Sequence, residues 1–292
     1  MRADATVLAA VPTRVGDLLE LTKPRITTLV VITAAVGYAV GARGFEPAFF
    51  TALLLGTAMV AGGASALNQH AERELDARME RTRHRPLPAG RLTPGEALAF
   101  GLALSGSGIV LLSTINALTP ALGAAALASY VLLYTPLKRL TSLCTVVGAV
   151  PGAIPPMMGW AAARGTLGSG AWSLFAVLFL WQLPHFLAIG WIYREDYARA
   201  GFPMLTVLDR DGRSTGRQMM LYSAALIPVT LVAGAWAAAG AGYLWSALAL
   251  GLVFFGASFR FAWTRSLAAA RVLFLISVLY LPLLLGLMVF DR

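Results

Sequence analysis

The stretch NQHAERELDARMERTRHRP, residues 68–86, lies between two long segments that carry no charge. Within it Asn68, Glu72 and Asp76 recur every four residues, and this spacing places three oxygen-bearing side chains on one face of a helix. Oxygen ligands are the ones that hard divalent cations prefer. The spacing therefore predicts a helix with a metal site, although alternating acids and bases are also typical of a plain solvated helix.

Arg81 and Arg85 follow the three oxygen ligands and are themselves four residues apart. Arginine binds phosphate oxygens in pairs through its planar guanidinium group. Cation ligands in a row beside two arginines are suited to bind a diphosphate together with its metal ion. We therefore expect Arg81 and Arg85 to contact a diphosphate group.

The composition is that of a membrane protein. The chain has 292 residues, of which 58% are hydrophobic and only 13% are charged, and its mean hydropathy is +0.72. Soluble domains carry about 25% charged residues. The single cysteine, Cys144, excludes an intrachain disulfide and a cysteine-based metal cluster. The apolar run at 7–11 is too short for a signal-peptide core, so we expect no cleaved signal.

The uncharged runs predict the spans. About 20 apolar residues cross a bilayer as a helix, and two double-length runs divide at the turn signals 116–120 and 240–242. The predicted spans are 26–42, 48–67, 97–115, 118–136, 143–163, 171–191, 218–239, 242–259 and 272–290. We expect an all-α polytopic membrane protein, a single domain over 1–292, with nine transmembrane helices around a central cavity. An N-tail, 1–25, and two catalytic loops, 68–96 and 192–217, complete it.

The basic residues are distributed unequally between the two sides of these spans. With the N-terminus placed inside, 20 of the 23 Lys and Arg residues fall on inner segments. This asymmetry is the orientation signal of membrane proteins. It predicts a cytoplasmic N-terminus, an external C-terminus and both long loops on the cytoplasmic face. The net charge of +9 therefore reflects basic residues in the loops beside the lipid bilayer. We expect the bilayer and not a nucleic acid as partner.

The second long loop begins with further titratable residues. If the sixth span continues as a helix, His185, Tyr193 and Asp196 share one face, because 11 residues make about three turns. His185 would then lie within the membrane, where ionisable residues are candidates for function by default. The alternative is a structural histidine bonded to a neighbouring helix.

Two other segments leave alternatives open. At the end of the fourth span, Tyr134 precedes Lys138 and Arg139, which either bind phosphate or only set orientation. The fifth span contains three prolines and several glycines. It is either a broken helix that lines a cavity or a site of close helix packing.

A membrane cavity whose opening is lined by carboxylates and arginines suits a ligand with an anionic head and a long apolar tail. A prenyl diphosphate has this form. A divalent cation such as Mg²⁺ makes the diphosphate a better leaving group, and Arg and Lys stabilise the growing charge. A dry pocket lined by aromatic rings shields the resulting allylic cation from water.

The chain resembles the UbiA superfamily of membrane prenyltransferases and, within it, the branch that farnesylates haem. The similarity runs from residue 21 to the last span. The matching motifs are LTKPR (21–25), N-x3-E-x3-D with its following arginines (68–86), YTPLKR (134–139), VGAVPGAIPPMMGW (147–160), WQLPHF (181–186) and DYARAGFPML (196–205).

The resemblance implies transfer of a farnesyl group from farnesyl diphosphate to a vinyl group of haem b, giving haem O for cytochrome oxidase assembly. Haem b is then a substrate and not a permanent cofactor, and haem A synthase is an expected partner in the cell inner membrane. The expected catalytic and metal residues are Asn68, Glu72, Asp76 and Asp196. The expected diphosphate-binding residues are Arg81, Arg85, Lys138, Tyr134 and Tyr193, and the haem candidate is His185.

The sequence departs from the superfamily in two places. Glu72 stands where aspartate is common, and a carboxylate is kept. The second motif is often a pair of aspartates four residues apart, whereas here only Asp196 matches, beside Tyr193 and Tyr197. Competing functions are a UbiA-type transferase with another aromatic acceptor, which would favour a fuller second motif, and a membrane transporter, which broken helices would suit.

Overall fold

A computed structural model describes residues 13–291, and these residues form helices and turns without β-strands. Nine of the helical segments described are long and apolar enough to cross a membrane. The prediction of an all-α protein with nine spans is therefore confirmed. Residues 1–12 and 292, with most of the expected N-tail, lie outside the described part of the chain.

Eight spans are single α-helices, and the fourth is built from three consecutive segments. The single-helix spans are α2 (Pro24–Gly41), α3 (Pro47–Asp76), α4 (Pro94–Ser113), α7 (Cys144–Arg164), α8 (Ser169–Ile192), α11 (Arg213–Trp236), α12 (Ala241–Thr264) and α13 (Leu267–Phe290). The fourth span joins α5 (Leu118–Ala128), the π-helix η1 (Ser129–Tyr134) and α6 (Thr135–Leu137). Three short helices lie outside the spans: α1 (Arg14–Leu21), α9 (Arg194–Arg199) and α10 (Leu205–Leu208).

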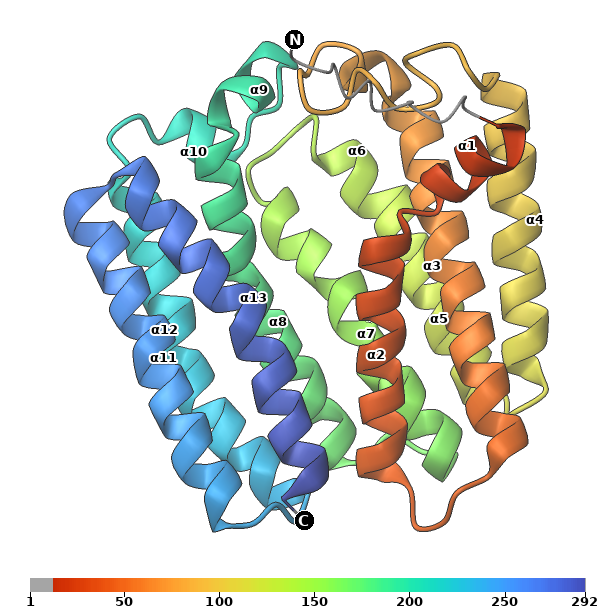
Figure 1. Ribbon diagram of the computed structural model, residues 1–292, viewed down its shortest axis with the longest axis vertical. Helices are drawn as coiled ribbons and strands as arrows, with labels where there is room; N and C mark the ends of the chain where they lie inside the picture. The colour runs from red at the N-terminus through yellow and green to blue at the C-terminus, as the bar shows by residue number, and fades with distance from the viewer. Residues whose placement is uncertain (1–12, 292) are drawn as a thin grey trace, which may run out of the picture.

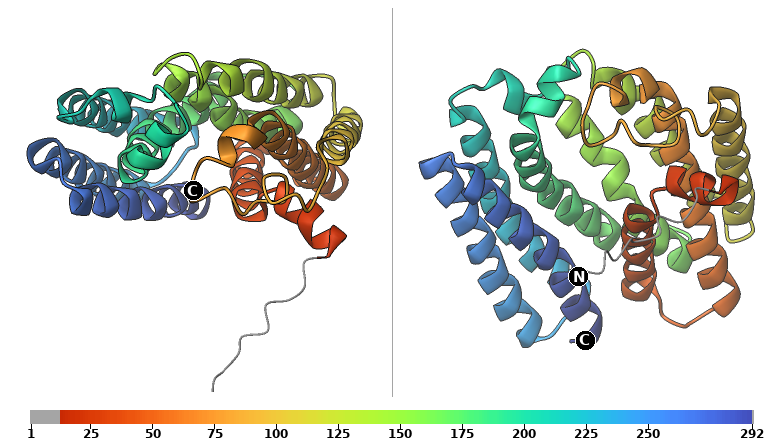
Figure 2. Two further views of the ribbon diagram at one scale, coloured as in Figure 1. Left: turned by 90° about the horizontal axis from the view of Figure 1, so that it is seen from above. Right: turned by 45° about the horizontal axis from the view of Figure 1, so that its top comes forward.

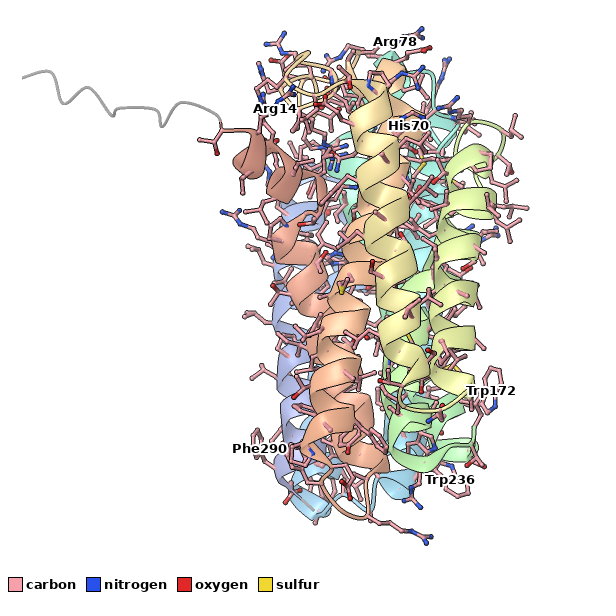
Figure 3. All side chains as sticks on the ribbon, turned by 90° about the vertical axis from the view of Figure 1, so that its right-hand side faces the viewer. Arg14, His70, Arg78, Trp172, Trp236 and Phe290 are labelled. Atoms are coloured by element: carbon pink, nitrogen blue, oxygen red, sulfur yellow. The ribbon has the colours of Figure 1, made fainter. Side chains whose placement is uncertain are left out.

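The short helices and the longer connections gather at one end of the bundle, at the top of Figure 1. We call this the loop end; it comprises α1, residues 77–93, residues 138–143 and residues 193–212. The helix α13 finishes at the opposite end (Figures 1 and 2). Charged side chains crowd the loop end near Arg14 and Arg78, whereas Trp172, Trp236 and Phe290 mark the other end (Figure 3).

Helix α3 is longer than the span predicted for it. It runs for 30 residues and includes Asn68, Glu72 and Asp76 in its last turns. The expected loop 68–96 is therefore helical at its start, and the true connection is 77–93. The next helix, α4, begins with a capping box in which the Thr93 side chain and the Glu96 side chain bond each other's backbone N–H.

Helix α7 is continuous through its three prolines, so the broken-helix alternative is not what the structure contains. Its glycines allow a close approach to α2. A Cβ atom added at Gly159 would lie 1.9 Å from the Ala34 carbonyl oxygen, and one at Gly37 would lie 2.0 Å from the Pro156 carbonyl oxygen. The two backbones therefore touch, which is the packing of small residues expected between membrane helices.

Helix α8 ends at Ile192, close to the end of the predicted span 171–191, so the helix does not continue through Asp196. Tyr193 has φ −108° and ψ 23°, outside the helical range, and α9 starts a new direction at Arg194. His185 and Asp196 consequently lie on different helices and share no single face.

Candidate functional site

Three buried oxygen-bearing side chains form a row along the last turns of α3. Asn68, Glu72 and Asp76 expose only 3%, 2% and 1% of their surfaces. Their spacing of four residues brings them to one face, as the sequence predicted. Buried carboxylates are costly unless they are paired or bind a metal ion, so the row requires cationic neighbours.

Each member of the row contacts a basic side chain from another part of the chain. Lys138 donates to both oxygens of Glu72, at 2.9 and 3.2 Å. Arg85 Nη1 lies 2.7 Å from Asp76 Oδ2. The third contact joins Lys23 Nζ to Asn68 Oδ1 at 3.4 Å.

The connection after α8, residues 193–212, supplies a carboxylate and aromatic rings. Asp196 on α9 is buried and pairs with Arg199, one turn away. Arg81 Nη2 donates to the Tyr197 hydroxyl at 3.2 Å, and its guanidinium lies 4.9 Å from the centre of the Tyr193 ring. The segments that follow α3 and α8 are therefore in direct contact at the loop end.

The two lysines of the site respond differently to their surroundings. Burial is the largest single effect and lowers the pKa of Lys138, but the attraction and hydrogen bonds of Glu72 together with the nearby tyrosines raise it overall. Burial lowers the pKa of Lys23 to about 7, and the nearby Arg85 charge adds to this effect. Glu72 thus favours the charged form of Lys138, whereas burial and the nearby positive charges make a proton on Lys23 costly.

The donor set of the row fits a divalent cation that is also held by its substrate. Asp76 Oδ1 is buried and has no hydrogen-bond partner, so this oxygen is available as a ligand. Among residues 13–291 no group of three or more His, Cys, Asp or Glu side chains is placed to hold one metal ion. Two carboxylates and an amide are nevertheless enough for Mg²⁺, which usually takes one or two carboxylates together with substrate phosphates.

His185 lies on α8 and faces α13. Its Nδ1 is 2.7 Å from the Ser277 hydroxyl, and its ring stacks on Trp181 at 5.0 Å and lies 5.2 Å from the Phe274 ring. These contacts agree with the structural alternative for this histidine. They also fix the ring so that Nε2 is the nitrogen left for a ligand.

Four contributors were absent from the predicted site. Lys23 precedes the first span and holds a left-handed backbone, with φ 49°. Thr135 accepts a hydrogen bond from the Asn68 amide at 3.1 Å. Tyr197 and Phe202 place their rings against basic side chains. The motifs that contain Lys23 and Tyr197 could be recognised in the sequence. The residues that these two side chains contact lie far away along the chain.

Within residues 13–291, nine apolar helices with a carboxylate row and basic side chains at one end define a multi-spanning membrane protein. Comparison with known families identifies the class. The profile of the UbiA prenyltransferase family matches residues 30–281. The chain belongs to the UbiA prenyltransferase family, and it is a membrane prenyltransferase.

Curated relatives are similar over nearly the whole chain. A protoheme IX farnesyltransferase of Solibacter usitatus is 50% identical, with 94% of this chain and 98% of the relative covered. The protein of the same name from Myxococcus xanthus is 46% identical, with 97% of each chain covered.

Solved structures share the fold at low sequence identity. A digeranylgeranylglyceryl phosphate synthase superposes with a TM-score of 0.80 at 15% identity, covering 95% of this chain and 98% of that one. A UbiA homologue from Archaeoglobus fulgidus bound to DMAPP and Mg²⁺ gives a TM-score of 0.69 at 14% identity, covering 93% and 99%. These likenesses confirm the architecture of the bundle.

Proposed function

We propose that this prenyltransferase transfers the farnesyl group of farnesyl diphosphate to a vinyl group of haem b, and that water completes the side chain of haem O. The observation that carries the proposal is the buried row of Asn68, Glu72 and Asp76, in which each side chain contacts a basic residue. The relatives named protoheme IX farnesyltransferase support farnesyl as donor group and haem as acceptor.

The diphosphate lies at the loop end in this proposal. Asn68, Glu72 and Asp76 would hold a divalent cation, with Asp196 from the connection after α8 as a further ligand. When bound, the cation takes negative charge from the diphosphate and makes it a better leaving group. The solved UbiA homologue with DMAPP and Mg²⁺ supports this assignment.

Basic and aromatic residues then stabilise the leaving group. Arg81, Arg85 and Lys138 bind the diphosphate oxygens and stabilise the charge that grows as the allylic C–O bond breaks. Tyr134 and Tyr193 line the same mouth. A new C–C bond joins the farnesyl group to the haem vinyl carbon, and water supplies the hydroxyl group and releases a proton.

His185 is the proposed residue that would hold haem b. Its Nδ1 contact with Ser277 sets the ring orientation, and a neutral imidazole with its other nitrogen open can bind haem iron. The stacked ring of Trp181 and the tilted ring of Phe274 supply apolar surface beside it.

The remaining assignments concern the cell. We place the loop end in the cytoplasm and the protein in the inner membrane, because 20 of the 23 basic residues fall on the predicted inner segments. A single domain covers the chain, and haem A synthase is the expected recipient of haem O in cytochrome oxidase assembly.

One reaction tests the proposal. Purified protein in detergent is given farnesyl diphosphate, haem b and Mg²⁺, and the extracted pigments are analysed by mass spectrometry. A farnesylated, hydrated haem supports the proposal. Consumption of farnesyl diphosphate only with another aromatic acceptor would instead assign a different member of the family.

A further inference from the structure

Arg81 is held by aromatic rings and not by a carboxylate. Its guanidinium carbon lies 4.9 Å from the centre of the Tyr193 ring and 5.6 Å from that of Tyr197. The Tyr197 hydroxyl also accepts a hydrogen bond from Arg81 Nη2 at 3.2 Å. Within residues 13–291 the salt bridges of this region involve its neighbours Arg83 and Arg85, whereas Arg81 forms none.

Lys138 has a ring on one side and a carboxylate on another. Its ammonium nitrogen lies 4.6 Å from the centre of the Phe202 ring while it donates to Glu72. Phe202 is only 1% exposed, so no water separates its face from a cation at this distance. The attraction between a cation and a ring face strengthens when water is excluded.

Two of the rings that face these cations, Tyr197 and Phe202, belong to one compact turn. Tyr197 and Phe202 contact each other edge to face, with centroids 6.0 Å apart and planes at 71°. The Phe202 N–H donates to the Tyr197 carbonyl oxygen at 3.0 Å, and the chain reverses at Gly201, with φ +76°. Gly201 adopts this conformation without the steric cost that a Cβ atom would bring. The turn therefore presents both rings as one unit.

We infer that Tyr197 and Phe202 are positioning residues that orient Arg81 and Lys138 toward the diphosphate. This inference rests on the proposed function, because it takes a prenyl diphosphate as the ligand. A carboxylate competes with phosphate for a cation: Glu72 does so for Lys138, whereas Arg81 has no carboxylate partner among residues 13–291. A ring face restricts a long side chain without cancelling its charge, so the cation stays available to the ligand.

A substitution series at Phe202 separates ring electrostatics from packing. Fluorinated phenylalanines keep the size of the ring and weaken the negative potential of its face. We incorporate 4-fluoro-, 3,5-difluoro- and 3,4,5-trifluorophenylalanine at Phe202 and measure farnesyl diphosphate binding with Mg²⁺ by calorimetry. Affinity falls stepwise with each fluorine, by about fivefold over the series, while the unfolding midpoint stays at the wild-type value.

Tyr197→Phe tests the other cation, since it removes the hydroxyl acceptor and keeps the ring. It weakens farnesyl diphosphate binding by roughly fivefold. The same fluorinated series at the exposed Phe259 on α12, and Tyr222→Phe on α11, are the matched controls and retain wild-type affinity.

The outcomes separate this inference from the proposed function. If wild-type protein binds farnesyl diphosphate but its affinity is independent of fluorine number and of the Tyr197 hydroxyl, the rings only pack and the positioning role is wrong. If wild-type protein fails to bind farnesyl diphosphate, the proposed function and the positioning role are both overturned.

Discussion

Arg85 contacts only one of the two carboxylate oxygens of Asp76. Its Nη1 atom lies 2.7 Å from Oδ2, whereas Oδ1 is buried without a hydrogen-bond partner. A buried oxygen without a partner is costly in a resting protein. The presence of such an oxygen at the end of the row is explained if a cation binds it as a ligand.

The first prediction is that Asp76→Asn lowers turnover by a factor of about 100 to 1,000. The amide keeps the size of the side chain but removes the charge that holds a divalent cation. Steady-state turnover at increasing Mg²⁺ measures the effect, and the variant should need more Mg²⁺ than the wild type. Asp211→Asn is the matched control, because Asp211 is an exposed carboxylate that also pairs with an arginine. Wild-type turnover of the Asp76 variant would remove the metal assignment.

The second prediction concerns the buried pair of Lys138 and Glu72. Lys138→Met leaves the Glu72 charge buried without its partner and should destabilise the protein by about 3–5 kcal/mol. Lys138→Met combined with Glu72→Gln removes both charges, so most of the stability should return while turnover stays low. Unfolding midpoints and turnover of the single and double variants form a mutant cycle. A double variant as unstable as the single one would show that the charge pairing is not the cause.

The third prediction is a pH dependence at the start of α11. Asp209 Oδ2 accepts from the Thr215 N–H and hydroxyl, both at 2.7 Å. Burial opposes ionisation, but the Thr215 hydrogen bonds outweigh it and lower the pKa of Asp209. A lowered folded-state pKa stabilises the fold above the unfolded-state value, near pH 4, and this stability is lost as the pH falls further.

Asp209→Asn should therefore lower the free energy of unfolding at neutral pH by about 1 kcal/mol. The gap between wild type and variant should close as the pH drops below about 4. Thermal unfolding in detergent over a pH series measures the gap. A gap that is constant with pH would mean that the Asp209 charge contributes nothing to it.

The fourth prediction fixes the orientation in the membrane. In a Cys144→Ala background, a cysteine in place of Arg83 at the loop end should react only with a label added on the cytoplasmic side. A cysteine in place of Arg43, in the exposed connection between α2 and α3, should react only from outside. Labelling of both positions from one side would contradict the nine-span topology.

The oxygen row was predictable because a helical repeat is a local property of the sequence. Asn68, Glu72 and Asp76 needed only the period of the helix to come together. Their cationic partners were not predictable in the same way. Lys138 reaches Glu72 across 66 residues and Lys23 reaches Asn68 across 45, and these pairings depend on how the spans pack.

Two local features could not be settled from the sequence. The end of α8 at Ile192 is followed by Tyr193 and Arg194, and no Gly or Pro directly after it marks the end in the sequence. For α7 the sequence left a broken helix and close packing both open, and the structure contains the continuous helix. A membrane helix tolerates proline where neighbouring helices pack closely against it. Helix α2 packs on α7 in this way, through Gly37 and Gly159.

The last prediction asks whether His185 binds haem or only packs against α13. His185→Phe keeps a flat ring against Trp181 and Phe274 but removes the nitrogen ligand. If the histidine binds iron, the variant should bind haem b at least tenfold more weakly and shift its Soret band, while farnesyl diphosphate affinity is unchanged. Ser277→Ala is the control, because it removes the hydrogen bond at Nδ1 and leaves the imidazole in place. This variant should change haem affinity less than His185→Phe does. Wild-type haem affinity and spectrum in His185→Phe would make His185 a packing residue and assign the axial position to another group.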